Sequence, residues 1–456
     1  MNISINLSTG KKEEIHLIKI LKNNAPDLKH QFDGSVFSSE VYCNNTDSAS
    51  VQAESLRRSG HKLWNIINDQ KLTSVTIVSE IDIENACIHL AEGLMLSSYA
   101  FDKYKSEKQK SYLKQITIRD KSTTRKTVKT LEKTVKANFT TRDLVNEPPV
   151  KLTATELSKR IKSLGKKHGF KTTVFNKAKI ETLKMGGLLS VNLGSETPPT
   201  FNILEWKPKN AKNKKPVVLI GKGVVYDTGG LSLKPTPNSM DLMKSDMAGS
   251  AAVVGAFCAI SSLELPVHVV GLIAATDNRP GKNAYAPGDV IHMFDGTSVE
   301  VMNTDAEGRL TLADALSYAK KYKPELVIDI ATLTGAAARA IGKEGIVCMG
   351  NARSKTLNNL KESGYRVHER LVEFPLWDDY GKQIKSDIAD LKNIGGPEAG
   401  AITAGKFLEH FTDYPWVHMD IAGSAFLTSE DSYRGKNATG VGVRLIFDFL
   451  KKTYDE

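Results

Sequence analysis

The chain has 456 residues and a net charge of +10, and 40% of its residues are hydrophobic. This composition is typical of a globular protein and excludes a mostly disordered or collagen-like chain. No apolar stretch approaches the roughly 18 residues that a membrane-spanning helix needs, and residues 1–6 lack the features of a secretory signal. The four cysteines show neither disulfide nor zinc-thiolate spacing. We therefore expect a cytoplasmic protein of two or three domains without membrane contact.

Short strands and helices alternate in the first hundred residues. Residues 15–20 form a short apolar run, and residues 72–79 are rich in β-branched side chains, which is typical of a strand. Residues 81–100 carry apolar side chains at helical spacing. Together these elements predict a small N-terminal α/β domain over residues 1–125.

The basic character of the chain is concentrated in residues 101–142, which hold 13 Lys or Arg against 4 Asp or Glu. Such a segment is typical either of a solvated helix face or of a surface that binds nucleic acid. It has no aromatic stacking pattern, which favours the solvated face and leaves nucleic acid as the alternative partner. A helix is predicted from about residue 126, and Pro148 and Pro149 should end it. We expect a connecting helix over residues 126–148.

Residues 149–456 have the pattern of a larger α/β domain. Strands alternate with helices, and several strands are apolar throughout, which favours a mostly parallel central sheet covered by helices. The predicted helices span residues 153–168 and 308–322, and the predicted strands span residues 201–206, 216–221, 265–275 and 325–330.

Several common catalytic motifs are absent from the sequence, namely the GxSxG elbow, the HExxH zinc-protease helix and the GxxxxGK[ST] phosphate loop. Gly221-Lys222-Gly223 follows an apolar strand and resembles the start of a dinucleotide-binding loop. Tyr226 occupies the place of the third glycine in that motif, so a nucleotide site is not favoured.

Five charged residues lie at or beside the ends of predicted apolar strands, where doubly wound sheets build their sites. Asp305 and Glu307 are two residues apart and project to the same side of an extended chain. Adjacent carboxylates repel each other unless a cation holds them, although any single one could instead cap a helix or end a turn. Four carboxylates together favour magnesium, manganese or zinc. The five residues are Lys222, Asp227, Asp246, Asp305 and Glu307.

The octapeptide NTDAEGRL, residues 303–310, resembles letter for letter the signature of the leucine aminopeptidase family, which are cytosolic two-metal aminopeptidases. Further segments are similar to the blocks of this family and follow in the same order. The resemblance covers about residues 140–456, whereas the first 125 residues or so match poorly. The similar segments include GKGVVYDTGG (221–230), MDLMKSDMAG (240–249), NRPGKNAYAPGDV (278–290) and WVHMDIAG (416–423).

The resemblance implies two divalent metal ions in each subunit. One site would consist of Asp227, Asp305 and Glu307, and a tighter one of Lys222, Asp227, Asp246 and Glu307. The ions would be Mn²⁺ or Zn²⁺, with Mg²⁺ or Co²⁺ as alternatives at the exchangeable site. A lysine ligand must be neutral, and both burial and two adjacent cations favour loss of its proton.

The resemblance also implies two catalytic residues that do not bind metal. Lys234 would supply positive charge where the tetrahedral oxyanion develops. Arg309 keeps its proton and would hold a bicarbonate ion that shuttles protons to the leaving amine. The pocket for the substrate side chain would be small and apolar, which favours Leu or Met, unless its Met and Ala residues pack in the core. Its residues would be Met243, Thr332, Gly335, Ala422 and Ala425.

These features together predict a metal-dependent aminopeptidase that removes Leu-like or Met-like residues from the N-termini of short peptides. Members of the family form hexamers, so the resemblance implies a homohexamer. The alternative is a regulator that binds nucleic acid on the same scaffold, which only the basic segment of residues 101–142 favours.

Overall fold

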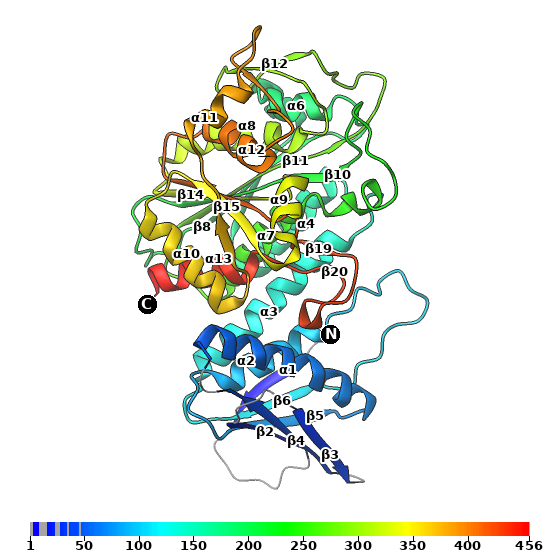
Figure 1. The fold of residues 1–456 in the computed structure, drawn as a ribbon, viewed down its shortest axis with the longest axis vertical. Coiled ribbons are helices and arrows are strands. Elements are labelled where there is room, and N and C mark those ends of the chain that lie inside the picture. The colour runs from blue at the N-terminus through cyan, green and yellow to red at the C-terminus, as the bar shows by residue number, and fades with distance from the viewer. Residues whose placement is uncertain (1–2, 9–15, 23–27, 34–35, 45–46, 456) are drawn as a thin grey trace. The chain divides into compact units, whose positions relative to one another are not determined.

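The computed structural model describes residues 3–8, 16–22, 28–33, 36–44 and 47–455. The chain forms two compact units (Figure 1). Both units combine strands with helices, which confirms the predicted α/β class with a smaller N-terminal part. Unit 1 comprises Met1–Phe139, Tyr365–His368 and Leu427–Asn437, and unit 2 comprises Thr140–Gly364, Glu369–Phe426 and Ala438–Glu456.

Unit 1 contains a six-stranded sheet among its described residues, in the order β1-β6-β5-β2-β4-β3. All neighbouring strands are parallel except β3 and β4. The predicted strand at residues 72–79 is confirmed as β5, whereas the predicted run at 15–20 begins outside the described residues. The strands are β1 (Ser4–Leu7), β2 (His16–Lys22), β3 (Leu28–Asp33), β4 (Val36–Cys43), β5 (Ser74–Ser79) and β6 (Gln115–Arg119).

Two helices of unit 1, α1 (Ala49–Asp69) and α2 (Ala86–Ser97), pack against each other through glycine. A Cβ atom at Gly60 would lie 2.4 Å from the carbonyl oxygen of Leu90, and one at Gly93 would lie 2.0 Å from that of Arg57. Neither position has room for a side chain. The predicted helix over residues 81–100 corresponds to α2. Its type is confirmed, and the helix is shorter at both ends than predicted.

Charged side chains of α1 hold two distant segments of the chain in unit 1. Arg57 Nε lies 2.5 Å from Glu92 Oε2, and Arg57 Nη2 donates to the carbonyl oxygen of Arg366 at 2.8 Å. The hydroxyl of Tyr433 donates to Glu54 Oε2 at 2.8 Å, and Tyr433 is only 2% exposed. Both segments therefore belong to this compact unit, and Tyr433 is part of its hydrophobic core.

The predicted helix from residue 126 is confirmed as α3 (Arg125–Asn146), which ends just before Pro148 as expected. The next predicted helix is confirmed as α4 (Ala154–His168). Thr153 caps α4, because its side chain accepts a hydrogen bond from the backbone N–H of Glu156 at 3.3 Å.

The basic segment contributes exposed side chains to α3. Arg125, Lys129 and Lys136 are exposed, and Lys136 Nζ lies 2.6 Å from Glu132 Oε1. Exposed lysines with an acidic partner one turn away are typical of a solvated helix face. The nucleic-acid alternative stays a prediction.

Unit 2 contains a nine-stranded sheet among its described residues, in the order β16-β15-β18-β14-β9-β11-β8-β7, with β10 beside β11. The central strands β18, β14, β9 and β11 are parallel, and antiparallel pairs occur toward both edges. This confirms the predicted mostly parallel sheet. The strands are β7 (Lys171–Phe175), β8 (Thr200–Trp206), β9 (Val217–Gly221), β10 (Gly223–Asp227), β11 (Val269–Asn278), β14 (Leu326–Ala331), β15 (Ile346–Gly350), β16 (Leu371–Glu373) and β18 (Trp416–Asp420).

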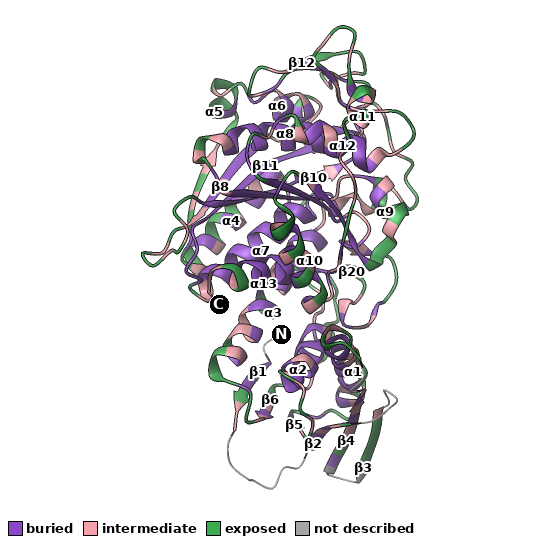
Figure 2. Ribbon diagram, turned by 60° about the vertical axis from the view of Figure 1, so that its left-hand side comes forward, coloured by how far each residue is buried: buried purple, intermediate pink, exposed green. Residues whose placement is uncertain are grey.

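Helices cover both faces of this sheet, and Figure 2 shows the buried strands between them. Every residue of β9, β11 and β14 is buried, which explains why these strands are apolar almost throughout. One face is covered by α4, α7 (Ala248–Ser262) and α13 (Val443–Tyr454), and the other by α6 (Gly186–Asn192), α8 (Glu307–Ala319) and α12 (Gly400–Glu409).

The remaining helices and strands are short or peripheral to this sheet. The helices are α5 (Lys177–Thr182), α9 (Gly335–Ile341), α10 (Ser354–Val367) and α11 (Asp378–Gly381). The strands are β12 (Val290–His292), β13 (Ser298–Glu300), β17 (Leu391–Lys392), β19 (Phe426–Leu427) and β20 (Asn437–Ala438).

Among the predicted strands, the one over residues 265–275 differs most from the structure, which places β11 at Val269–Asn278. The first predicted residues form a loop, in which the carbonyl oxygen of Pro266 accepts a hydrogen bond from Lys212. At the other end, the strand continues through Thr276, Asp277 and Asn278. An apolar pattern cannot indicate that extension, because these three residues are polar.

The expectation that no apolar stretch is long enough to cross a membrane is wrong. The helical stretch Met240–Ser262 is long and apolar enough to cross a membrane, although no such stretch was expected. Its apolar window is 94% buried inside the protein, as is typical of a core helix, so it is weak evidence for a membrane span. A core helix has apolar surroundings on every side, as a membrane-spanning helix does, and both are therefore apolar around their whole circumference.

A buried carboxylate on α8 gives the stability of unit 2 a predicted pH dependence. Asp314 accepts hydrogen bonds from the N–H groups of Leu188 at 2.8 Å and Phe294 at 2.9 Å. Burial nevertheless raises the pKa of Asp314 to about 7, well above its unfolded value. Because the folded pKa is the higher one, the stability contributed by protonated Asp314 is complete below about pH 4 and is lost as pH rises through 7.

The free energy of unfolding of the wild type should therefore fall relative to Asp314→Asn between about pH 4 and pH 7. The relative slope should be at most about 1.4 kcal/mol per pH unit, because one proton is involved. Urea unfolding of both proteins across this range measures it. A constant difference between the two proteins would show that Asp314 does not titrate there.

Candidate metal and active site

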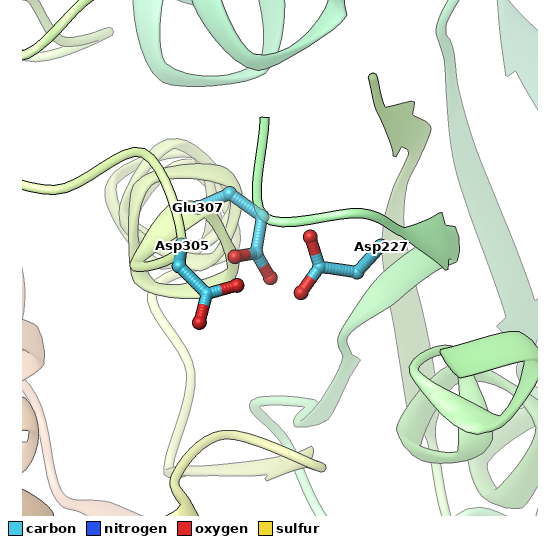
Figure 3. Close-up of side chains that lie close together, drawn as sticks. All are labelled: Asp227, Asp305 and Glu307. Carbon is cyan, nitrogen blue, oxygen red and sulfur yellow. The ribbon is translucent and has the colours of Figure 1, made fainter. Parts of the chain in front are cut away.

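Acidic and basic side chains converge at the C-terminal ends of the central strands of unit 2. Lys222 follows β9 directly, Asp227 is the last residue of β10, and Glu307 is the first residue of α8. Figure 3 shows the carboxylates of Asp227, Asp305 and Glu307 directed toward one another. One oxygen from each lies within 4.8 Å of the others, so these three residues could hold a metal ion.

The Lys222 ammonium joins the fourth carboxylate to this group. Its Nζ lies 2.8 Å from Asp246 Oδ1 and 2.9 Å from Glu307 Oε1, and it donates to the carbonyl oxygen of Thr332 at 2.9 Å. A Cβ atom at position 308 would lie 2.4 Å from Lys222 Cε. The glycine after Glu307 therefore allows Lys222 to pack against the first turn of α8.

The second lysine, Lys234, contacts the other side of the carboxylate group. Its Nζ lies 2.8 Å from Asp227 Oδ2 and also pairs with Asp305. Its side chain is 14% exposed, against 3% for Lys222. Of the two ammonium groups, Lys234 is the one with access to solvent.

Burial and mutual repulsion dominate the electrostatics of the carboxylates. Burial, followed by the charge of Glu307, raises the pKa of Asp227 to about 7. Burial likewise raises the pKa of Asp246 well above its usual range. Burial opposes ionisation of Glu307 too, but the charges of Lys222 and Lys234 outweigh it and lower the pKa of that residue. The two lysines therefore neutralise the four carboxylates incompletely.

The same carboxylates keep the two lysines charged. Burial alone would lower the pKa of Lys222, but Asp246 and Glu307 outweigh burial and raise it above the usual value. The neutral Lys222 that metal binding requires is therefore not produced by the protein groups alone. Additional positive charge close to Lys222 would be needed to remove its proton.

Arg309 projects from the first turn of α8 and is anchored at one end. Its Nη1 donates to the carbonyl oxygen of Asn393 at 2.9 Å, and the residue is 6% exposed. Burial lowers the pKa of Arg309 to about 10, which still leaves the guanidinium charged at neutral pH. Its Nε atom has no hydrogen-bond partner among the residues that the structure describes.

Of the predicted pocket residues, the structure brings Thr332 directly to the carboxylate group. Its hydroxyl donates to Asp246 Oδ1 at 3.0 Å. Met243 and Ala422 are partly buried, Gly335 is exposed at the start of α9, and Ala425 is only 2% exposed. The pocket role of all five residues, Thr332 included, stays a prediction.

The sequence reasoning assigned no role to two buried asparagines that hold the site loops. Asn393 donates from Nδ2 to the carbonyl oxygen of Asn303 at 2.7 Å and accepts from the N–H of Met302 at 2.8 Å. Asn278 donates to Asp227 Oδ1 at 2.8 Å. The available signal was a polar residue at the end of an apolar strand, within a segment already seen to resemble the family.

Comparison with known proteins identifies similar sequences across most of the chain. The family model described as the catalytic domain of the cytosol aminopeptidase family matches residues 139–447. The model of the N-terminal domain of the same family matches residues 47–108. The resemblance therefore extends into the first 125 residues, which were expected to match poorly.

Several relatives carry the name probable cytosol aminopeptidase. The one from Chloroherpeton thalassium is 51% identical over 313 residues, which are 68% of this chain and 61% of that protein. The one from Chlorobium limicola is 44% identical over 392 residues, or 81% of this chain and 76% of that protein. For Clostridium perfringens the identity is 40% over 415 residues, or 88% and 84%. The match to the first of these relatives spans about three-fifths of its length.

Proposed function

Because the chain belongs to the cytosol aminopeptidase family, we propose that it is a metal-dependent aminopeptidase that removes apolar N-terminal residues from short peptides. The observation that carries this proposal is the convergence of the carboxylates of Asp227, Asp305 and Glu307 within 4.8 Å. Such a group in a largely buried position needs more positive charge than its two lysines supply.

The donor set suits two divalent cations. Asp227, Asp305 and Glu307 would hold one, and Lys222, Asp227, Asp246 and Glu307 would hold the other, with Mn²⁺ or Zn²⁺ as the expected ions. With Lys222 neutral, the four carboxylates and two divalent cations balance in charge. Buried Asp246 Oδ2, which has no hydrogen-bond partner among the described residues, supports this fit. When bound, the ions would acidify a water molecule and polarise the scissile carbonyl.

The chain itself would supply the remaining charges of the reaction. Lys234 is fixed by Asp227 and Asp305, so its ammonium is preorganised to stabilise the oxyanion that develops on the substrate carbonyl. Arg309 keeps its charge, and its unpartnered Nε supports a role in holding an anion such as bicarbonate. A free peptide N-terminus, in its neutral form, would be a ligand for a bound ion, and this requirement distinguishes an aminopeptidase from an endopeptidase.

Hydrolysis of leucine p-nitroanilide in the presence and absence of a chelator tests the proposal. Activity should disappear when the chelator removes the metal and return when Mn²⁺ or Zn²⁺ is added in excess, because the protein groups alone cannot activate water at neutral pH. A Glu307→Ala variant, treated identically, controls for contaminating peptidases. Activity that persists in the chelated protein after its metal content has fallen to zero would contradict metal dependence.

We also propose a cytoplasmic homohexamer, as implied by the family. Several large apolar side chains of unit 2 are exposed in the single chain, which supports contacts with further copies. Multi-angle light scattering should give six chains per particle, and a stable, fully active monomer at working concentration would contradict the assembly. The exposed side chains include Leu231 at 50%, Leu233 at 61%, Met302 at 46% and Ile388 at 66%.

A further inference from the structure

Asn278 is a fully buried amide that lies beside Asp227 in the sheet. It is the last residue of β11 and pairs in register with Asp227, the last residue of β10. Its Nδ2 donates both to Asp227 Oδ1 at 2.8 Å and to the carbonyl oxygen of Thr304 at 2.9 Å. Its Oδ1 has no hydrogen-bond partner among the described residues and faces Gly230, where a Cβ atom would lie 2.9 Å away. Of the Asn278 side chain, only the NH₂ group therefore forms hydrogen bonds among the described residues.

The first of these two contacts fixes the orientation of the Asp227 carboxylate. Asp227 Oδ1 also accepts a hydrogen bond from the N–H of Gly229 at 2.8 Å. Because two donors occupy Oδ1, Oδ2 is the oxygen that is left available to a cation in the carboxylate group. Asp227 Oδ2 contacts Lys234 there, which agrees with this orientation.

The second contact fixes the peptide that precedes Asp305. The carbonyl oxygen of Thr304 accepts from Asn278 and also from the hydroxyl of Tyr285, at 2.8 Å. Thr304 is fully buried, and its own hydroxyl donates to the carbonyl oxygen of Gly229 at 2.6 Å. Asn278 thus connects the segments that carry Asp227 and Asp305, which are far apart in the sequence.

We propose that Asn278 is a positioning residue for the metal site. It occupies Oδ1 of Asp227 and so leaves Oδ2 as the oxygen that binds metal, and it fixes the spacing between Asp227 and Asp305. This inference rests on the proposed metal-dependent function. Both neighbours of the Asn278 NH₂ group are acceptors, so the position requires a short side chain that donates twice. Among the amino acids of similar shape, aspartate would only accept and leucine would do neither.

The test measures metal binding by the purified protein rather than its activity. Asn278→Leu removes both donors and keeps the shape of the side chain, and Asn278→Ala is the second variant in case the first folds poorly. Competition between the protein and a chromogenic chelator for Co²⁺ should show affinity about 10–100-fold weaker in both variants, the usual loss for an outer partner of a ligand. The visible absorption of the bound Co²⁺ should also change, because the Asp227 carboxylate is no longer held in one orientation.

Two control variants separate this role from a general loss of structure. Tyr285→Phe removes the other donor to the Thr304 carbonyl and leaves Asp227 untouched. Asn202→Leu removes an equally buried amide from β8, whose Nδ2 donates to the Thr200 hydroxyl and to the carbonyl oxygen of Ile273. Both controls should bind Co²⁺ within a few-fold of the wild type and keep its absorption spectrum.

Four outcomes would decide between the possibilities. Wild-type affinity and spectrum in both Asn278 variants would overturn the inference. Equal losses in Asn202→Leu would overturn it as well, because they would assign the effect to packing. Equal losses in Tyr285→Phe would overturn the role of Asn278 in orienting Asp227, because they would assign the effect to the Thr304 carbonyl alone. If the wild type itself binds no metal, the proposed function fails first, and this result is distinguishable because it precedes any comparison of variants.

Discussion

Glu307→Ala should abolish peptide hydrolysis and reduce the metal content of the protein while unit 2 stays folded. Glu307 is 1% exposed and contacts Lys222 at 2.9 Å, and the lysines keep its pKa below the usual range, so its negative charge is present at neutral pH. The proposal gives Glu307 contacts to both ions. Because the loss of an outer partner alone costs about 10–100-fold in affinity, the loss of a shared ligand should exceed 100-fold.

Elemental analysis and equilibrium dialysis measure this loss, and circular dichroism monitors the fold. Glu369→Ala is a matched control, since Glu369 is a buried glutamate of the same unit that pairs with Arg444 at 3.2 Å and lies outside the carboxylate group. The control variant should be less stable and still bind metal. A Glu307→Ala protein with near-normal turnover and two metal ions per chain would contradict the assignment of Glu307 as a ligand.

The two lysines should separate into a catalytic residue and a ligand. Lys234→Ala should keep its metal ions, or bind them more tightly, because a competing ammonium has been removed from Asp227 and Asp305. Its turnover should nevertheless fall by about 10²–10³, the usual cost of losing one group that stabilises an oxyanion. Lys222→Ala should instead weaken metal binding, because it removes a proposed nitrogen ligand of the tighter site.

Titration of both variants with Mn²⁺, followed by kinetics at saturating metal, distinguishes these roles. Excess metal should restore turnover to Lys222→Ala in part and to Lys234→Ala not at all. Equal metal loss in the two variants would show that the roles of the lysines have been assigned wrongly.

Sequence patterns that extend over a few residues predicted several helices and strands correctly. The helices α3 and α4 and the apolar strands β9 and β14 were predicted to within two residues, because periodicity and prolines act over a few positions. The placement of Asp227 and Glu307 near each other was also predictable, since the ends of parallel strands meet at one edge of a sheet.

The features that were missed depend on partners far away in the chain. The predicted strand ends at Ala275, three residues before Asn278, and no local pattern indicates the contact of Asn278 with Asp227. Likewise, no pattern indicates that Lys222 pairs with Asp246 and Glu307 while Lys234 pairs with Asp227 and Asp305. Which cation faces which carboxylate is determined by the tertiary fold.

Unit 1 consists of three segments from distant parts of the chain, and this affects when it can fold during synthesis. Residues 1–139 contain every strand of its sheet, yet Arg57 donates to the carbonyl of Arg366, and Glu54 accepts from Tyr433. When only the first part of the chain has been synthesised, Arg57 has Glu92 as a partner but lacks the carbonyl of Arg366, and Glu54 lacks the hydroxyl of Tyr433. An incomplete set of partners is costly for a buried charge. The unit that is translated first can finish folding only after residue 437 has been translated.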